Sequence, residues 1–258
     1  MPIIKCVNQP IRYEKWGNKT SLPPIIFLHG WNNNITGWYK QIPFFSKYTE
    51  VYAYDQIGHG KSSRSRDIDY SMDFMAAILY QFIKKLKIKR PVIAGHSMGG
   101  MLAQYFALKH PDLISKIILL CTSFGIPRPL KKAPYFLHPI ARILAKFFKP
   151  IQYFMNSFPH KSLTKKEAHN DFKRAVATDP YGSFKILGAI VSLSMKNEVA
   201  KIKNDILFIT GTYDIFTNQI PFYHKLGATV KLIKNGEHNL HGHFYKQVNK
   251  IMYEFIKS

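Results

Sequence analysis

The sequence predicts an α/β fold with a mostly parallel, doubly wound sheet, helices on both of its faces and a helical insertion. Short apolar segments typical of buried strands alternate with segments whose apolar residues recur at helical spacing, up to residue 121 and again from residue 205. Between residues 126 and 200 this alternation stops, and Pro-rich and Lys-rich helical pieces replace it. We therefore expect a core domain of residues 1–125 and 201–258 that carries residues 126–200 as a helical insertion.

Each expected element follows from its local pattern. The expected strands cover residues 3–7, 11–16, 23–30, 50–55, 91–96, 116–121, 205–211 and 228–236, the first two as an antiparallel pair. The expected helices of the core cover residues 38–48, 71–87, 98–110 and 244–257. In the second of these helices the apolar residues recur close to helical spacing, and Ser71 is placed to cap its N-terminus.

Composition and charge limit the classes of protein to be considered. The 37 Lys and Arg residues against 15 Asp and Glu give a net charge of +22, which attracts anionic partners. No nucleic-acid motif accompanies the charge, and the densest basic run, residues 84–90, falls where a helix should end and cations suit its dipole. We therefore expect no nucleic-acid partner.

Neither a membrane span nor a secretory signal is expected. The longest apolar stretches are much shorter than the roughly 20 residues that cross a bilayer, and the N-terminus lacks the apolar core of a signal peptide. A cytoplasmic location is the expectation. The two cysteines, Cys6 and Cys121, lie in apolar segments and are expected to be inert buried thiols rather than a disulfide.

A serine with a recognisable environment follows the expected strand at 91–96. Residues 95–99 read GHSMG, a G-x-S-x-G sequence, with a helical pattern directly after it. Glycines suit a tight strand-to-helix turn because the backbone of the serine is strained there and neighbouring side chains would collide. A tight turn and a catalytic role for Ser97 are therefore compatible, since such a turn exposes the hydroxyl of Ser97.

Further motifs in the same order make the chain resemble the α/β-hydrolase superfamily. They are HGW at 29–31, DQIGHGKS at 55–62, GHSMGG at 95–100, GTYD at 211–214 and GEH at 236–238. The resemblance implies the α/β-hydrolase fold and a serine hydrolase that needs neither cofactor nor metal. It also implies that the insertion is a lid over the active site.

Three residues are the candidates for a catalytic triad. A serine hydroxyl is a weak nucleophile and needs a base, and that base needs a carboxylate to hold its tautomer. His238 follows the last expected strand and matches the histidine position of the family, and Asp214 follows strand 205–211. The order Ser97, Asp214, His238 along the chain is that of α/β hydrolases.

Other residues near these motifs are assigned supporting roles. The resemblance implies that the oxyanion is bound by the backbone N–H groups of Trp31 and Met98. Asp55 is interpreted as shaping its own loop. A metal site at His238, His241 and His243 is the weaker alternative, because no Cys or carboxylate pattern beyond Glu237 accompanies these histidines.

The insertion is expected to select the substrate. Residues 140–151 place apolar side chains on one helical face and basic ones on the other, which suits an acyl pocket or simple packing on the core. Residues 126–204 contain 15 Lys and Arg and 4 Asp and Glu. This excess fits an anionic membrane surface, an acidic acyl carrier protein, or a bias towards lysine without a partner.

The sequence thus favours hydrolysis of a carboxylic ester with an apolar acyl group, as in carboxylesterases and monoacylglycerol lipases. Some resemblance to pimeloyl-carrier-protein methyl ester esterases of biotin synthesis keeps that activity as an alternative. C–C bond hydrolysis or perhydrolysis by the same triad is a further alternative activity. A non-catalytic binding protein is disfavoured because every expected catalytic position is filled.

Overall fold

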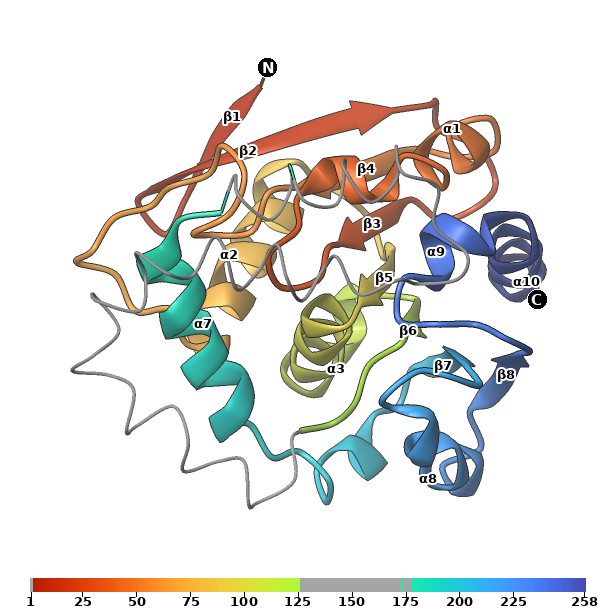
Figure 1. The fold of residues 1–258 in the computed structure, drawn as a ribbon. Helices are drawn as coiled ribbons and strands as arrows, with labels where there is room; N and C mark the ends of the chain where they lie inside the picture. Colours follow the sequence, from red (N-terminus) through yellow and green to blue (C-terminus); the bar gives the residue numbers. More distant parts are fainter. Residues whose placement is uncertain (1, 126–172, 174–177) are drawn as a thin grey trace.

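The computed structural model describes residues 2–125, 173 and 178–258, and its centre is one eight-stranded sheet (Figure 1). The strand order is β1-β2-β4-β3-β5-β6-β7-β8, with β1, β2 and β4 paired antiparallel and all other pairs parallel. The strands are β1 (Ile3–Cys6), β2 (Gln9–Trp16), β3 (Ile25–Leu28), β4 (Val51–Tyr54), β5 (Val92–His96), β6 (Lys116–Leu120), β7 (Asp205–Gly211) and β8 (Thr229–Ile233). The predicted fold class is confirmed.

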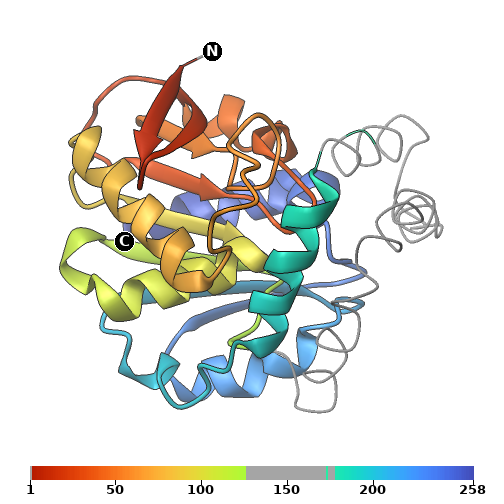
Figure 2. The same cartoon turned by 90° about the vertical axis from the view of Figure 1, so that its left-hand side faces the viewer.

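Helices cover both faces of the sheet (Figure 2). They are α1 (Ile42–Phe45), α2 (Met72–Lys85), α3 (Met98–Lys109), α7 (Pro180–Ser192), α8 (Ile220–Lys225), α9 (Leu240–His243) and α10 (Tyr245–Lys257), with 3-10 turns at Ile35–Trp38, Pro111–Leu113, Val199–Lys201 and Thr217–Gln219. The Ser71 hydroxyl accepts a hydrogen bond from the backbone N–H of Phe74 and so caps α2 as expected.

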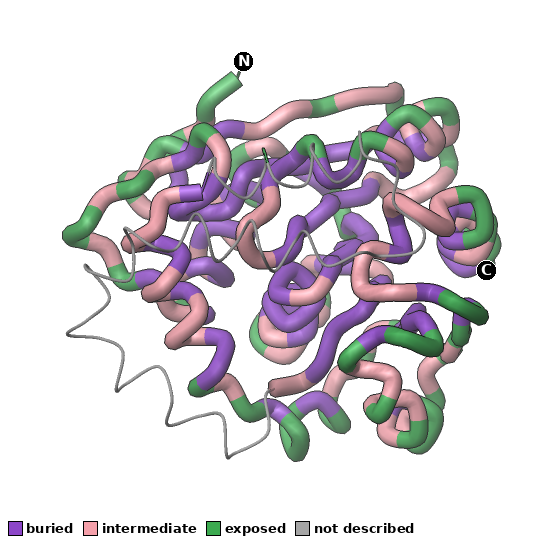
Figure 3. The backbone as a smooth tube through the Cα atoms, in the orientation of Figure 1, coloured by how far each residue is buried: buried purple, intermediate pink, exposed green. Residues whose placement is uncertain are grey.

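Two apolar cores lie on opposite sides of the sheet because successive side chains of a strand point to opposite faces. In β3, Ile26 and Leu28 belong to the core formed with α2 and α3, whereas Ile25 and Phe27 belong to the core formed with α1 and α10. Figure 3 shows the central strands buried along their length. A parallel sheet covered on both faces explains why these strands are apolar without alternation.

One expected helix differs from the structure. The pattern at 38–48 predicts a single helix, but the chain forms the 3-10 turn Ile35–Trp38 and then the four-residue helix α1. Pro43 lies in the first turn of α1, where its missing N–H costs nothing, whereas a helix running from residue 38 would place it in the interior. The turn and the short helix are therefore separate elements.

The expected insertion lies between two neighbouring strands, since β6 and β7 pair in parallel and the chain between them includes residues 126–200. Of this segment the structure describes residue 173 and residues 178–200, which include α7. The amphipathic helix expected at 140–151 lies outside the described residues. The division into core and lid stays a prediction.

Among the described residues, no helix combines the length and the apolar character needed to cross a membrane. Cys6 and Cys121 are both buried and free, as expected.

Candidate active site

Ser97 lies at the carboxyl edge of the sheet, between the end of β5 and the start of α3. Its backbone has φ 51° and ψ −117°, a conformation that L-residues adopt only when their surroundings enforce it. The backbone N–H of Ser97 donates to the carbonyl of Leu120 at 3.0 Å, and the Thr122 hydroxyl donates to the Ser97 carbonyl at 2.6 Å. Both bonds come from β6 and the residues after it, so the neighbouring strand holds the turn.

The glycines on either side of Ser97 allow α3 to approach the sheet closely. A Cβ atom at Gly99 would lie 2.1 Å from the carbonyl oxygen of Leu28, and one at Gly95 would lie 2.2 Å from the carbonyl oxygen of Gly99. Both distances are far below van der Waals contact, and both neighbours are backbone atoms that cannot rotate away. The G-x-S-x-G spacing is therefore a packing requirement of the turn that presents Ser97.

His238 and Asp214 form a hydrogen-bonded pair at the same edge. Asp214 follows β7, His238 follows β8, and Nδ1 of His238 lies 2.5 Å from Oδ2 of Asp214. The other carboxylate oxygen, Oδ1, accepts the backbone N–H of Phe216 at 2.8 Å. Burial acts to raise the pKa of the Asp214 carboxyl, but the imidazole of His238 and these donors outweigh it and hold that pKa below its ordinary value.

His96 connects the His238 loop to the strand that ends at Ser97. Its Nε2–H donates to the backbone carbonyl of His238 at 2.8 Å, and the two rings lie 4.9 Å apart. The His96 ring also contacts that of His241, tilted by 47° with centroids 4.4 Å apart, and the His241 ring contacts that of Trp38, tilted by 42° with centroids 4.7 Å apart. A column of rings thus runs from the core to His238, which is about one third exposed.

The HGW loop passes next to Ser97. A Cβ atom at Gly30 would lie 3.4 Å from the Cβ of Ser97 and 2.8 Å from Nδ1 of His96. Trp31, whose N–H we expect to bind the oxyanion, follows directly, and Met98, the other expected donor, is the first residue of α3. The structure thus brings the sequence-predicted site residues to one edge of the sheet.

Two buried histidines hold these loops as neutral acceptors. Nε2 of His29 accepts the backbone N–H of Gln56 at 2.9 Å, and Nε2 of His59 accepts that of Asn32 at 3.1 Å. Burial lowers the pKa of His29 to about 4, and burial lowers those of His59 and His96 to about 3. The three rings are therefore uncharged at neutral pH, as the acceptor roles of His29 and His59 require.

Asp55 shapes its loop, in agreement with the sequence-based interpretation. Its carboxylate accepts backbone N–H groups from Ile35 and Lys61, both at 2.9 Å, and pairs with the buried side chain of Arg12. Asp55 thereby ties β2, the HGW loop and the DQIGHGKS loop together.

Cys121 is a neighbour of the pair that the sequence did not reveal. Its Sγ donates to the carbonyl of Glu237 at 3.7 Å, and its thiol, a carboxylate oxygen of Asp214 and a ring nitrogen of His238 lie within 4.8 Å of one another. Burial raises the pKa of the thiol well above its ordinary value, which disfavours metal binding. A metal there would also have to break the bond between Asp214 and His238.

The alternative metal site at three histidines is not what the described residues form. The His241 ring contacts those of Trp38 and His96, whereas His243 lies 4.0 Å from a carboxylate oxygen of Glu237. The group of three ligand atoms found among the described residues includes His238 but neither of the other two.

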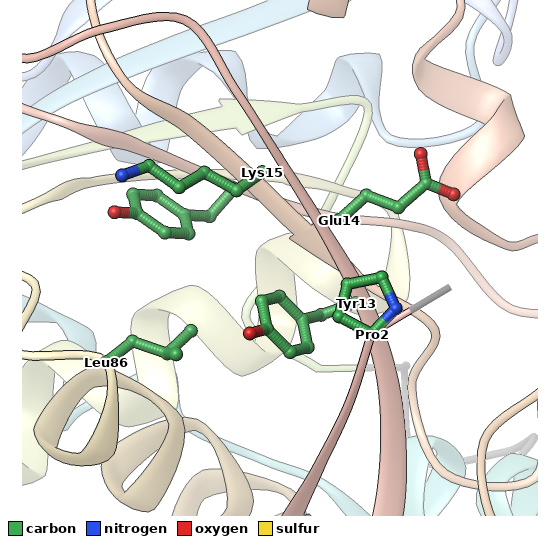
Figure 4. A pocket seen from close by; sticks show the side chains of 6 residues that line it. Pro2, Tyr13, Glu14, Lys15 and Leu86 are labelled. Carbon is green, nitrogen blue, oxygen red and sulfur yellow. The ribbon is translucent and has the colours of Figure 1, made fainter.

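A separate hollow lies beside β1, β2 and the end of α2 (Figure 4), on a different part of the molecule from Ser97. It is lined by Pro2, Tyr13, Glu14, Lys15, Tyr52 and Leu86. The ammonium of Lys15 is paired with Glu50 at 2.5 Å, so the hollow offers no unpaired cation from this lysine.

Comparison with known proteins identifies the family to which this fold belongs. A family model described as the alpha/beta hydrolase fold matches residues 23–163, more than half of the chain. The chain belongs to this family.

Individual relatives agree with this assignment. The chain is 31% identical over 140 residues to the uncharacterized hydrolase YugF of Bacillus subtilis, which covers 52% of this chain and 50% of YugF. It is similar in structure to an esterase from Exiguobacterium antarcticum, with TM-score 0.83 and 21% identity over 99% of both chains. An enol-lactonase from Burkholderia xenovorans matches over 100% of both chains, with TM-score 0.79 and 20% identity. These structures show the fold alone, and the chain spans about half or less of the curated relatives that it matches.

Replacing Gly99 should destabilise the protein, because the new Cβ would overlap the carbonyl of Leu28. We expect Gly99→Ala to lower the free energy of unfolding by about 2 kcal/mol, measured by urea denaturation. Gly188 of α7 is the matched control, since no atom of the described residues lies within 4 Å of a Cβ there. Gly188→Ala should be neutral or stabilising by up to about 1 kcal/mol. Equal effects of the two substitutions would contradict the packing argument.

Acid should destabilise the protein through His29, His59 and His96. Their folded-state pKa values of about 4, 3 and 3 lie below the unfolded value of about 6.5, so only the unfolded chain takes up protons between these limits. Stability is therefore lost as pH falls through this window, by about 1.4 kcal/mol per pH unit for each histidine. Urea unfolding between about pH 7 and pH 5 measures the slope.

The exposed His224 provides the control for the acid experiment. A His224→Gln variant should keep the slope of the parent protein, because the substitution leaves the three buried rings in place. Stability that stays constant from about pH 7 to pH 5 would rule out buried neutral histidines as the cause of acid sensitivity.

Proposed function

We propose that the protein is a serine hydrolase that cleaves carboxylic esters through Ser97, His238 and Asp214. The observation that carries this proposal is the strained turn at Ser97, with φ 51°, beside a loop whose His238 is hydrogen-bonded to buried Asp214 at 2.5 Å. A strained backbone and a buried carboxylate both cost stability, and together they supply what an activated serine needs.

In the proposed mechanism Ser97 Oγ attacks the acyl carbon while Nε2 of His238 takes the hydroxyl proton. Asp214 holds Nδ1–H of His238, which fixes the tautomer and stabilises the imidazolium that forms. The backbone N–H groups of Trp31 and Met98 bind the oxyanion. His238 then protonates the leaving alcohol, and water, deprotonated by the same ring, hydrolyses the acyl-enzyme to the acid and free Ser97.

The proposed substrate is an ester with an apolar acyl group, collected under the insertion. Support comes from the apolar pattern of that segment and from the esterase and lactonase names of structural relatives. A methyl ester on an acidic acyl carrier protein is an alternative that uses the basic character of residues 126–204. C–C bond hydrolysis or perhydrolysis would use the same three residues with a different acyl partner or nucleophile.

A fluorophosphonate probe tests the nucleophile. We expect covalent labelling of the folded wild-type protein at Ser97, because the activated hydroxyl attacks phosphorus as it attacks an acyl carbon. Peptide mass spectrometry locates the label. Ser97→Ala should abolish labelling, whereas the control Ser192→Ala, at the exposed end of α7, should keep it. A folded wild-type protein that stays unlabelled would refute the proposed function.

A panel of esters tests the substrate class. We expect p-nitrophenyl esters of medium chain length to have the highest kcat/KM, with a gain of about 0.8 kcal/mol for each methylene group that becomes buried. A monoacylglycerol and a carrier-linked methyl ester complete the panel. Turnover confined to the carrier-linked ester would replace the proposed substrate with the carrier alternative. Labelling of Ser97 without turnover of any ester would favour C–C bond hydrolysis.

A further inference from the structure

Helix α7, the described end of the insertion, contacts the HGW loop through Ser183. The indole N–H of Trp31 donates to the backbone carbonyl of Ser183 at 3.1 Å. The hydroxyl of Ser183 donates to the side-chain oxygen of Asn32 at 2.7 Å. One fully buried residue of α7 thus binds two consecutive residues of the loop whose backbone is expected to receive the oxyanion.

The opposite side of the loop is held by the core. The backbone N–H of Asn32 donates to Nε2 of His59, and Gly30 lies against His96 and Ser97. Asn32 itself has φ 57°, in the left-handed region that non-glycine residues seldom adopt. The loop at Trp31 therefore passes between two supports, the core on one side and Ser183 on the other, and its backbone is held in an unfavourable conformation.

The helix that carries Ser183 is itself anchored to the core. The Asp179 side chain caps α7 by accepting the N–H of Gly182 at 2.8 Å, and the backbone N–H of Asp179 donates to the carbonyl of Gly58 at 3.1 Å. A Cβ atom at Gly182 would lie 3.1 Å from the Cα of Gly58, so the two backbones are in close contact. In Figure 2 α7 runs across the edge of the sheet to which the central strands point.

We infer that Ser183 is a positioning residue that sets the orientation of the Trp31 backbone N–H towards the oxyanion. This inference rests on the proposed function. The insertion then does more than enclose the substrate, because its last helix holds one of the two groups that stabilise developing charge. Such groups act only when they are aligned before the reaction begins, so a loosened loop lowers the rate more than it lowers substrate binding.

The experiment compares Ser183→Ala with Asn32→Gly and the double variant. Glycine suits φ 57°, so Asn32→Gly removes the acceptor without adding backbone strain. We expect Ser183→Ala to lower kcat on the order of 10-fold with KM changed less than about twofold. Affinity for a trifluoromethyl ketone, whose adduct with Ser97 carries an oxyanion, should fall by the same factor as kcat/KM. The double variant should lose no more activity than the less active single variant, because both substitutions remove the same hydrogen bond between Ser183 and Asn32.

Ser192→Ala on the same helix is the matched control, since its exposed hydroxyl donates to the carbonyl of Ala189 within α7. It should leave kcat, KM and ketone affinity unchanged. Thermal unfolding of every variant separates a local effect from loss of the fold. If Ser183→Ala unfolds, Asn32→Gly tests the same hydrogen bond by removing its acceptor in the loop.

The results distinguish this inference from the proposed function. A wild-type protein without fluorophosphonate labelling refutes the function itself. A labelled wild type whose Ser183→Ala variant keeps its kcat and ketone affinity refutes only the positioning role. A loss confined to KM, or a loss matched by Ser192→Ala, would also overturn it.

Discussion

The close packing of α3 against β3 and β5 is the constraint on which the rest of the site depends. Two glycines permit it, and it forces Ser97 into a backbone conformation that an isolated chain would avoid. Bonds from β6 and the residue after it hold the turn in place. The conformation of Ser97 is thus held by its neighbours in the core rather than by its own local preference.

Around this turn, buried neutral rings connect loops from distant parts of the chain. His29 and His59 bind backbone groups as acceptors, and His96 binds the carbonyl of His238 while its ring contacts those of His238 and His241. An imidazole can both donate and accept in the neutral state, which suits it to joining backbone groups in places that water does not reach. The same property makes the arrangement sensitive to acid, because protonation would leave a buried charge and remove an acceptor.

The insertion is coupled to the core by a short path. Ser183 lies one residue from Gly182, which packs on Gly58, and it binds Trp31 and Asn32 directly. Helix α7 is thereby hydrogen-bonded to the loop whose backbone, under the proposed function, binds the oxyanion.

The sequence by itself determined the order of the elements, the two-sided sheet, and the positions of Ser97, Asp214 and His238 relative to the strand ends. Such features depend on periodicity and on motifs at fixed spacing, both of which are local. It predicted one helix over 38–48 where the position of Pro43 divides the segment, and the helix expected at 140–151 lies outside the described residues.

Only the tertiary structure decided which buried groups support the site. Cys121 follows an apolar strand and Ser183 lies within an ordinary helical pattern, so neither has a local signal. Cys121 lies near Asp214, 93 residues further along the chain. Ser183 is hydrogen-bonded to Asn32, from which it is separated by 151 residues. Contacts of this kind depend on how the sheet twists and how the helices pack on it, and no short stretch of sequence contains that information.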